Sequence, residues 1–497
     1  MKSCFVLFLI FFLLLTVSSK AGTKLDFKTV DMLTYHCFEE KKWDSVIVVG
    51  KQALHQDIDY YYLRVRLGIA YFEKQEYIPA TVHLRKARQF NSGDPMVSDY
   101  LYRAYVYTNR NEEAYILKET FPVEDRETTG SKSGFLELVH FESGYTLSSD
   151  NAPKNLSTLM GHDSIYGEQD LYGNNFYTDL NVKVKISNRV SISMTYNYLN
   201  FTKTKYIQYG KREDNLNSIT DTIFGKNYNY TFPWVIYDTS FRYHISQNEV
   251  HIGATITLPD GFKIMPAIHW VHVSYPMINS RFHMDSIQDT AFYTSIDNVY
   301  HTFPFARASY SYEQKDTAFN NWVASLTITK DLGIFNIGLS GSWSNLNNKK
   351  QIQAGLILTY YPLGNLNFYG TNTVTGFFQG KDTRLLLSQV IGAKVAPWLW
   401  LEGNFYYGDY TNANIFNGSI IYNNSDIIDY RAGANLVFVI NKHIQLSLIY
   451  QYFRKENQQL YYVKTINPDT HLPIETLKTE NNPYNTNTLI GGITWKL

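Results

Sequence analysis

Apolar and polar residues alternate strictly through three consecutive stretches between positions 322 and 361. In the first stretch one face is apolar, formed by Trp322, Ala324, Leu326 and Ile328. The turn signal at residues 330–333 follows, and the same alternation returns over residues 335–343 and 352–360. Runs of about 10 residues with a period of two and aromatic residues near their ends are typical of a transmembrane β-barrel. The pattern predicts three such strands in succession.

The alternation continues outside this stretch, over residues 180–186, 190–198, 250–256, 399–407 and 444–452. We therefore predict a large antiparallel barrel over residues 134–497, with about 16 strands and a range of 14–18. The count is open between residues 204 and 312, where a periplasmic turn at residues 259–261 would require an additional strand near residues 289–295. A soluble all-β sandwich is the alternative.

Short turns are predicted at residues 330–333, 362–365, 396–398 and 440–443, each separated from the next by two strands. They belong to one edge of the barrel, which short turns mark as periplasmic. Longer polar segments are predicted to be external loops, at residues 149–173, 204–230, 408–427 and 456–483.

The chain ends in another alternating segment, in which Ile493, Trp495 and Leu497 share one face. This segment resembles the terminal strand of outer-membrane barrels, which the barrel assembly machinery recognises. That group usually ends in phenylalanine, whereas this chain ends in Leu497. The resemblance implies that both ends of the barrel are periplasmic and that the strand count is even.

Composition agrees with a barrel that has aromatic girdles and a wet interior. Aromatic residues make up 16% of the chain, with 41 Tyr and 8 Trp, and charged residues only 18%, against about 25% in typical soluble domains. The 45 basic and 45 acidic side chains cancel, so no global field favours nucleic acid as a partner.

Residues 1–21 are predicted to be a secretory signal peptide. Lys2 provides the basic start, residues 5–17 are apolar, and Ser19 or Ala21 offers a small residue for cleavage. The apolar core is too short to span a bilayer as a stable helix. An exported chain of alternating strands is expected in the outer membrane of a Gram-negative cell.

Residues 24–121 follow a helical period, and they repeat. The central copy contains Leu67, Gly68, Tyr71, Ala80 and Ala87, and shifts of 34 residues in either direction bring large and small residues into register. The segment resembles the tetratricopeptide repeat, which implies stacked helix pairs in the periplasm that bind a partner. An unrelated small helical bundle is the alternative. Polar residues 122–133 are predicted to link this module to the barrel.

Charged residues on the polar face of the strands are candidates for lining the lumen: Lys183, Lys185, Arg384, Glu402 and Arg431. They could line a permeation path or pair with one another and close it. No catalytic, cofactor or metal site is predicted. His269 and His272 would lie on opposite faces of a strand, and residues 338–342 lack the last glycine of a nucleophile elbow.

The layout resembles the YaiO-like outer-membrane proteins and the bacterial exopolysaccharide exporters, in which helical repeats precede a barrel. The resemblance implies a channel or transport protein with a glycan or polysaccharide as its cargo. Because catalytic signatures are scarce in the sequence, we predict that the protein is not an enzyme and has no cofactor. One alternative is a non-conducting anchor or assembly scaffold that binds envelope proteins through its repeats. A lipid-modifying enzyme of the outer membrane is the third.

Overall fold

The computed structural model describes residues 25–121, 134–150, 164–212, 234–294, 299–423, 425–466 and 473–497. The predicted signal peptide and the predicted linker lie outside these residues. The chain divides into two compact units, residues 1–110 and residues 111–497.

The first unit contains the helices α2 (Phe27–Glu39), α3 (Trp43–His55), α4 (Tyr61–Glu73), α5 (Tyr77–Phe90) and α6 (Pro95–Tyr107). The short helix α7 (Asn111–Lys118) belongs to the second unit. The helices α2, α4 and α6 begin 34 residues apart, and so do α3, α5 and α7. The period seen in the sequence is therefore the period of the helices, while the resemblance to the tetratricopeptide repeat stays a prediction. No helix in the described part of the chain is both long and apolar enough to cross a membrane.

Local signals explain where two of these helices begin. Asp26 caps α2 by accepting a hydrogen bond from the Thr29 backbone N–H at 2.7 Å. Asp94 caps α6 in the same way through Met96 and Val97, and Pro95 occupies the first turn, where it sacrifices no hydrogen bond.

The repeat residues singled out in the sequence form the centre of the helical unit. Leu67, Ala80 and Ala87 are fully buried, and Tyr71 is 3% exposed. Gly68 lets α4 approach α5 closely, because a Cβ atom at this position would lie 2.6 Å from Leu84 Cδ2.

Gly68→Val is expected to destabilise the helical unit by about 1–3 kcal/mol, because the added methyl groups overpack the contact with Leu84. Urea unfolding of the full chain, followed by helical circular dichroism, measures the loss. Gly93→Ala is the control, since its nearest neighbour is the Asn91 side chain at 3.6 Å. Equal stability of the two variants would show that α4 and α5 do not meet at Gly68.

The second unit is a closed antiparallel barrel of 14 strands, which confirms the predicted fold class. The first strand, β1, pairs with the last, β16, and this pairing closes the wall. The strands that form the wall are β1 (Leu136–Ser148), β2 (Ser164–Ser187), β3 (Val190–Arg212), β4 (Trp234–Leu258), β5 (Phe262–Thr294), β6 (Val299–Leu332), β7 (Phe335–Ser344), β8 (Gln351–Tyr360), β9 (Phe368–Gln379), β10 (Asp382–Ala396), β11 (Leu399–Tyr407), β14 (Ile427–Val439), β15 (Ile444–Ile466) and β16 (Pro473–Lys496).

The strand count is 14 rather than 16, at the lower end of the predicted range. The difference arises between residues 262 and 332, where only two strands, β5 and β6, run for 33 and 34 residues. No additional strand is needed there, because residues 289–294 lie at the far end of β5. The turn at Pro259–Gly261 consequently lies on the same edge as the turn between β6 and β7.

The outer wall carries the apolar face predicted from the alternation. Leu326 and Leu339 are 44% and 59% exposed, and aromatic side chains border this band of aliphatic residues. On β7 the border residues Phe335 and Trp343 are eight positions apart, roughly 26 Å along a strand. Ile493, Trp495 and Leu497 are exposed on the same outer face. An outward apolar band of this height between aromatic girdles identifies an outer-membrane β-barrel.

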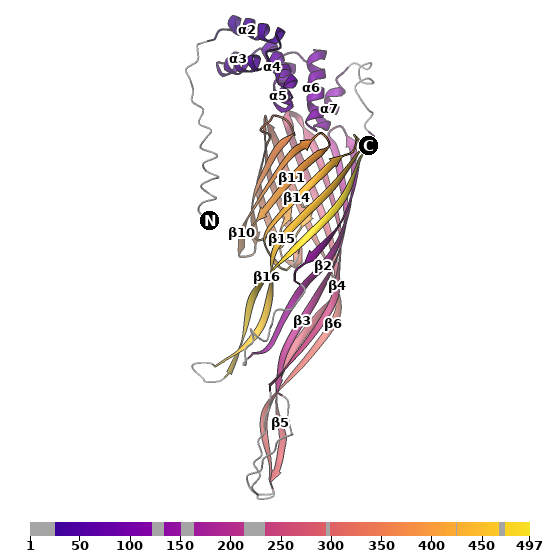
Figure 1. The fold of residues 1–497 in the computed structure, drawn as a ribbon, viewed down its shortest axis with the longest axis vertical. Coiled ribbons are helices and arrows are strands. Elements are labelled where there is room, and N and C mark those ends of the chain that lie inside the picture. The colour runs from indigo at the N-terminus through magenta and orange to yellow at the C-terminus, as the bar shows by residue number, and fades with distance from the viewer. Residues whose placement is uncertain are drawn as a thin grey trace. The chain divides into compact units, whose positions relative to one another are not determined.

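The wall is uneven in height. The strands β7 and β8 have 10 residues each, enough to cross a bilayer once, whereas β2 to β6, β15 and β16 have 23 or more. The long strands continue past the barrel at the end opposite the C-terminus (Figure 1). The predicted external loops at residues 149–173, 204–230 and 456–483 are therefore partly strand, and residues 151–163, 213–230 and 467–472 among them lie outside the described residues.

Candidate functional site in the barrel lumen

The connection between β11 and β14 folds into the barrel. We call residues 409–423 and 425–426 the lumen segment; it contains a small hairpin of β12 (Asn414–Ile415) and β13 (Ile420–Ile421). Residues 408–427 do connect two strands at the edge predicted to be external, but the prediction that they face outward is wrong, because they bond to the inner wall. Although the segment is polar, its partners are the inner walls of strands far away in the sequence.

The tip of the hairpin reaches the wall formed by β5 and β6. Phe416, Asn417 and Gly418 all have positive φ, which makes the turn tight. The Asn417 carbonyl accepts a hydrogen bond from Ser325 Oγ at 2.7 Å, and its side-chain amide donates to the Met265 carbonyl at 2.9 Å. A nitrogen of the His269 ring lies 2.7 Å from the Gly418 carbonyl and donates to it.

The flank of the hairpin is held by β7 and β8. Gln353 on β8 donates to the Asn414 carbonyl at 2.8 Å and accepts from the Asn414 backbone N–H at 2.9 Å. The Gln353 side chain thus forms the two hydrogen bonds that the backbone of a neighbouring strand would form with Asn414. Ser342 on β7 accepts a further hydrogen bond from the Asn414 side chain at 3.0 Å.

The base of the segment is anchored on β10. Arg384 Nη1 lies 2.6 Å from Asp409 Oδ2, and Arg384 Nη2 donates to the Thr411 carbonyl at 3.1 Å. Tyr410 donates to the Leu387 carbonyl at 2.9 Å. Tyr410 and Ala413 also pack on inward apolar side chains of β9, β10, β11 and β14, namely Phe377, Leu386, Tyr406 and Ile428.

These contacts explain why a polar loop can lie inside a barrel. A buried backbone N–H or C=O without a partner costs free energy comparable to a lost hydrogen bond, and the inner wall supplies partners on many sides. Sequence reasoning missed the segment because local patterns do not record such distant pairs. Apolar residues at inward positions, such as Leu386 and Val271, were the available signal. In a lumen filled only with water these side chains would be exposed to solvent.

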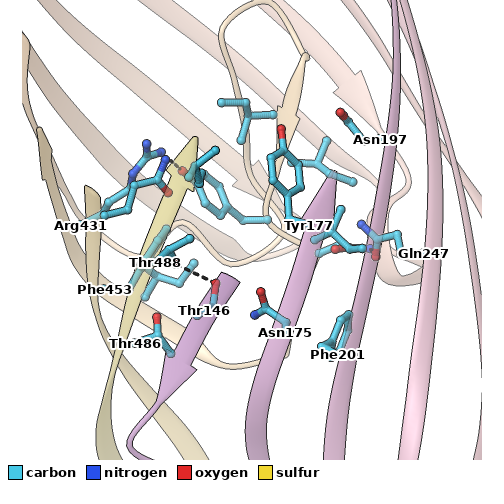
Figure 2. Close-up of a pocket in the computed structure, with 18 of the residues that line it drawn as sticks. Thr146, Asn175, Tyr177, Asn197, Phe201, Gln247, Arg431, Phe453, Thr486 and Thr488 are labelled. Carbon is cyan, nitrogen blue, oxygen red and sulfur yellow. Dashed lines mark hydrogen bonds between the residues drawn. The ribbon is translucent and has the colours of Figure 1, made fainter. Parts of the chain in front are cut away.

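The lumen segment borders two cavities. The charged chamber, of about 230 Å³, lies between residues 419–423 and the inner face of β1 to β4 and β14 to β16. Figure 2 shows Tyr177, Asn197, Gln247 and Arg431 around it. Its ionisable residues include Glu142, Glu249, Arg431 and Lys455, and its aromatic residues include Tyr172, Phe201 and Phe453.

The hydroxyl chamber, of about 150 Å³, lies on the other side of the hairpin. Serine and threonine residues of β6, β7, β9 and β10 line it, together with Gln353 and Ile357 of β8, Leu386, Tyr406, Tyr410 and residues 414–417. Neither chamber reaches the range of about 300–1,000 Å³ that is usual for sites enclosing a drug-sized ligand. Each of these two chambers has room only for a small solute.

The five charged residues predicted to line the lumen all have partners. Arg384 holds Asp409, and Arg431 donates to the Tyr422 hydroxyl of the lumen segment at 2.6 Å. Glu402 accepts from Tyr369 at 2.5 Å.

The other two predicted charges interact with helix α7 of the same unit. Lys183 forms ion pairs with Glu137 at 3.0 Å and with Glu112 of α7 at 3.5 Å. The Lys185 ammonium lies 3.2 Å from the centre of the Tyr115 ring, also on α7. The structure therefore brings Arg384 and Arg431 to the lumen segment and the two lysines to α7.

The two histidines of the His269-x-x-His272 pattern point to different environments. His269 is fully buried in the lumen, where its Nε2 atom lies 3.1 Å from Glu249 Oε2. His272 instead contacts the Asn320 side chain at 2.9 Å in an exposed position. The two rings therefore do not converge on one metal.

The helical unit has its own polar centre on α2 and α4. Arg66 donates to Asp31 Oδ1 at 2.7 Å and to Thr34 Oγ1 at 2.9 Å, while the rings of Tyr35 and Tyr62 flank its guanidinium group. Burial opposes ionisation of Asp31, but the hydrogen bonds from Arg66 and Tyr60 outweigh it and hold the pKa of Asp31 below its usual value. Tyr35 and Tyr62 are 55% and 61% exposed, so this centre presents an aromatic surface.

No protein-family model and no curated protein matches the sequence. Solved structures match the barrel at low similarity. A FadL homologue from Pseudomonas aeruginosa is 10% identical, with a TM-score of 0.39 over 73% of this chain and 90% of that chain. The toluene transporter TodX of P. putida is 9% identical, with a TM-score of 0.35 over 72% and 90%. The Acinetobacter baumannii outer membrane protein Omp33 is 8% identical, with a TM-score of 0.32 over 73% and 100%.

Proposed function

We propose that this protein transports a small polar, glycan-like solute across the outer membrane, and that the lumen segment is the gate of its channel. The observation that supports this most is the combination of polar groups with aromatic and aliphatic side chains in the chambers on both sides of the segment. The charged chamber combines carboxylates, amides and aromatic rings, such as Glu142, Asn197 and Phe201. Sugars offer hydroxyl groups to such amides and carboxylates and apolar ring faces to such aromatic side chains.

The gate role follows from how the lumen segment is held. Apart from the anchor between Arg384 and Asp409, most of its bonds to the wall join neutral groups, and a typical hydrogen bond of this kind contributes about 0.5–1.5 kcal/mol. A longer glycan or polysaccharide requires the segment to move, because the two chambers are small. We propose transport rather than catalysis, and no step of it needs a cofactor.

Uptake of sugars of increasing size into liposomes that contain the purified protein tests this function. The intact protein is expected to admit a monosaccharide and to exclude a tetrasaccharide. Liposomes as impermeable to the monosaccharide as protein-free liposomes would contradict transport through the resting channel.

We further propose that the helical unit lies in the periplasm and binds a protein of the cell envelope there. Both ends of the barrel lie at the edge with short turns, which is periplasmic in outer-membrane barrels. The exposed pair Tyr35 and Tyr62 offers an aromatic contact surface of the kind enriched in protein interfaces.

A photo-reactive amino acid at position 62 is expected to give a discrete cross-linked product with an envelope protein in cells. The matched control is position 91, which is exposed in the loop after α5. Equal products at both positions, or none at position 62, would contradict the docking role.

A non-conducting anchor is the second candidate. The many bonds between the lumen segment and the wall favour it, because they keep the lumen filled. Impermeable liposomes together with a cross-linked partner at position 62 would support the anchor over the channel.

A further inference from the structure

Three potential metal ligands converge on the inner wall where the first strands of the barrel meet the last. His140 and Glu142 lie on β1 and Asp179 lies on β2, and one ligand atom from each falls within 4.8 Å of the others. A metal ion with ligand distances of about 2.0–2.2 Å holds its ligands about 3–4 Å apart. Small side-chain rotations therefore suffice to bring the three groups around one ion.

The two carboxylates face each other, and the His140 ring lies 3.2 Å from Glu142 Oε2. Glu142 and Asp179 are directly paired across β1 and β2, and like charges in that position repel. Among the described residues, neither forms an ion pair with a lysine or an arginine. Asp179 is only 8% exposed, so water screens it poorly.

A fourth group independently points to a missing ligand. Asn197 lies across from Asp179 on β3, is 6% exposed, and donates its amide N–H to Glu249 at 3.3 Å on the β4 side. Its Oδ1 atom is buried and has no hydrogen-bond partner in the part of the chain that the structure describes. A buried amide oxygen without a partner is costly unless something binds it.

The surrounding residues already orient the ligands. His140 Nδ1 lies 2.7 Å from Thr494 Oγ1 on β16, which leaves Nε2 directed at Glu142. Tyr177 donates to Glu142 Oε1 at 2.8 Å, while Glu142 Oε2 lies 3.2 Å from His140 Nε2. A Cβ atom at position 492 would lie 3.3 Å from His140 Cε1, so Gly492 makes room for the ring. Metal-binding histidines usually donate their second ring N–H to an oxygen acceptor. The Thr494 hydroxyl takes this place beside His140.

We propose that His140, Glu142 and Asp179 bind a divalent first-row transition-metal ion, with Asn197 as a fourth ligand, and that this ion joins β1 to β2. The imidazole favours Zn²⁺ or Mn²⁺ over Mg²⁺ and Ca²⁺, which prefer oxygen ligands throughout. The charged chamber gives the ion access, because Glu142 and Asn197 line it.

The test is calorimetric titration of the metal-free, refolded full chain with Zn²⁺ and Mn²⁺, with Mg²⁺ and Ca²⁺ as comparisons. We expect one equivalent of Zn²⁺ or Mn²⁺ to bind, and to raise the unfolding temperature. Asp179→Asn should weaken binding more than about tenfold, and Thr494→Val should weaken it by roughly 10–100-fold through the orientation of His140.

Glu402→Gln is the matched control, because it removes an inward carboxylate that accepts from Tyr369 on a distant part of the wall. It should leave binding unchanged. Asp179→Asn also removes a repulsion, so the barrel should still fold, which heat-modifiable migration on gels checks. Absence of saturable binding, equal binding by Asp179→Asn and the intact chain, or equal affinity for Ca²⁺ would overturn the site.

Discussion

Leu339→Arg is expected to lower the stability of the membrane-inserted barrel by about 2–4 kcal/mol, because it places a cation at the middle of the lipid-facing band. Leu339 is the fifth of the 10 residues of β7 and is 59% exposed on the outer wall. Reversible unfolding in denaturant from lipid vesicles, followed by tryptophan fluorescence, measures the difference.

Leu363→Arg is the matched control. Leu363 is nearly as exposed, at 54%, but it lies in the turn between β8 and β9. Near the membrane interface the same substitution costs only about 0–1 kcal/mol. Equal losses at both positions would mean that the outer face of β7 does not meet the hydrocarbon core.

Asp409→Ala is expected to release the lumen segment without unfolding the barrel. The substitution removes the ion pair with Arg384 at 2.6 Å and the hydrogen bond from the Thr411 backbone N–H at 2.9 Å. Hydrogen bonds to charged groups contribute about 1.5–3 kcal/mol. Hydrogen exchange should show a loss of protection of this size in residues 409–423, while the wall strands keep their protection.

Asp382→Ala provides the comparison for this anchor. Asp382 also pairs with Arg384, at 3.0 Å, but its side chain is 48% exposed and lies outside the segment. Its loss should leave the exchange of the lumen segment nearly unchanged. If the two variants behaved alike, Asp409 would not be the anchor.

The barrel could be predicted from the sequence because its main signal is local. Lipid faces one side of every strand, so residues such as Leu326 and Leu339 must be apolar at every second position. The repeat is likewise local: Gly68 and Leu84 record the close contact of two neighbouring helices.

Strand length and the lumen segment could not be predicted in the same way. Beyond the membrane β5 and β6 are held by their mutual pairing, so nothing in the alternation marks where a strand leaves the bilayer. The lumen segment depends on pairs such as Gln353 with Asn414, which are 61 residues apart. A polar sequence predicts an external loop in either case, because the sequence alone does not show whether its hydrogen-bond partners are water or the inner wall.

The most direct test of a gated channel is the conductance of two proteins in planar bilayers, the intact chain and a variant in which two glycines replace residues 412–422. Two glycines are long enough to join the ends of the deletion. The ends lie side by side, because the Asn412 backbone N–H donates to the Tyr422 carbonyl at 2.6 Å. Heat-modifiable migration checks that the variant folds. We predict a several-fold higher single-channel conductance for the variant. Equal conductance of the two folded proteins would contradict the assignment of the lumen segment as the gate.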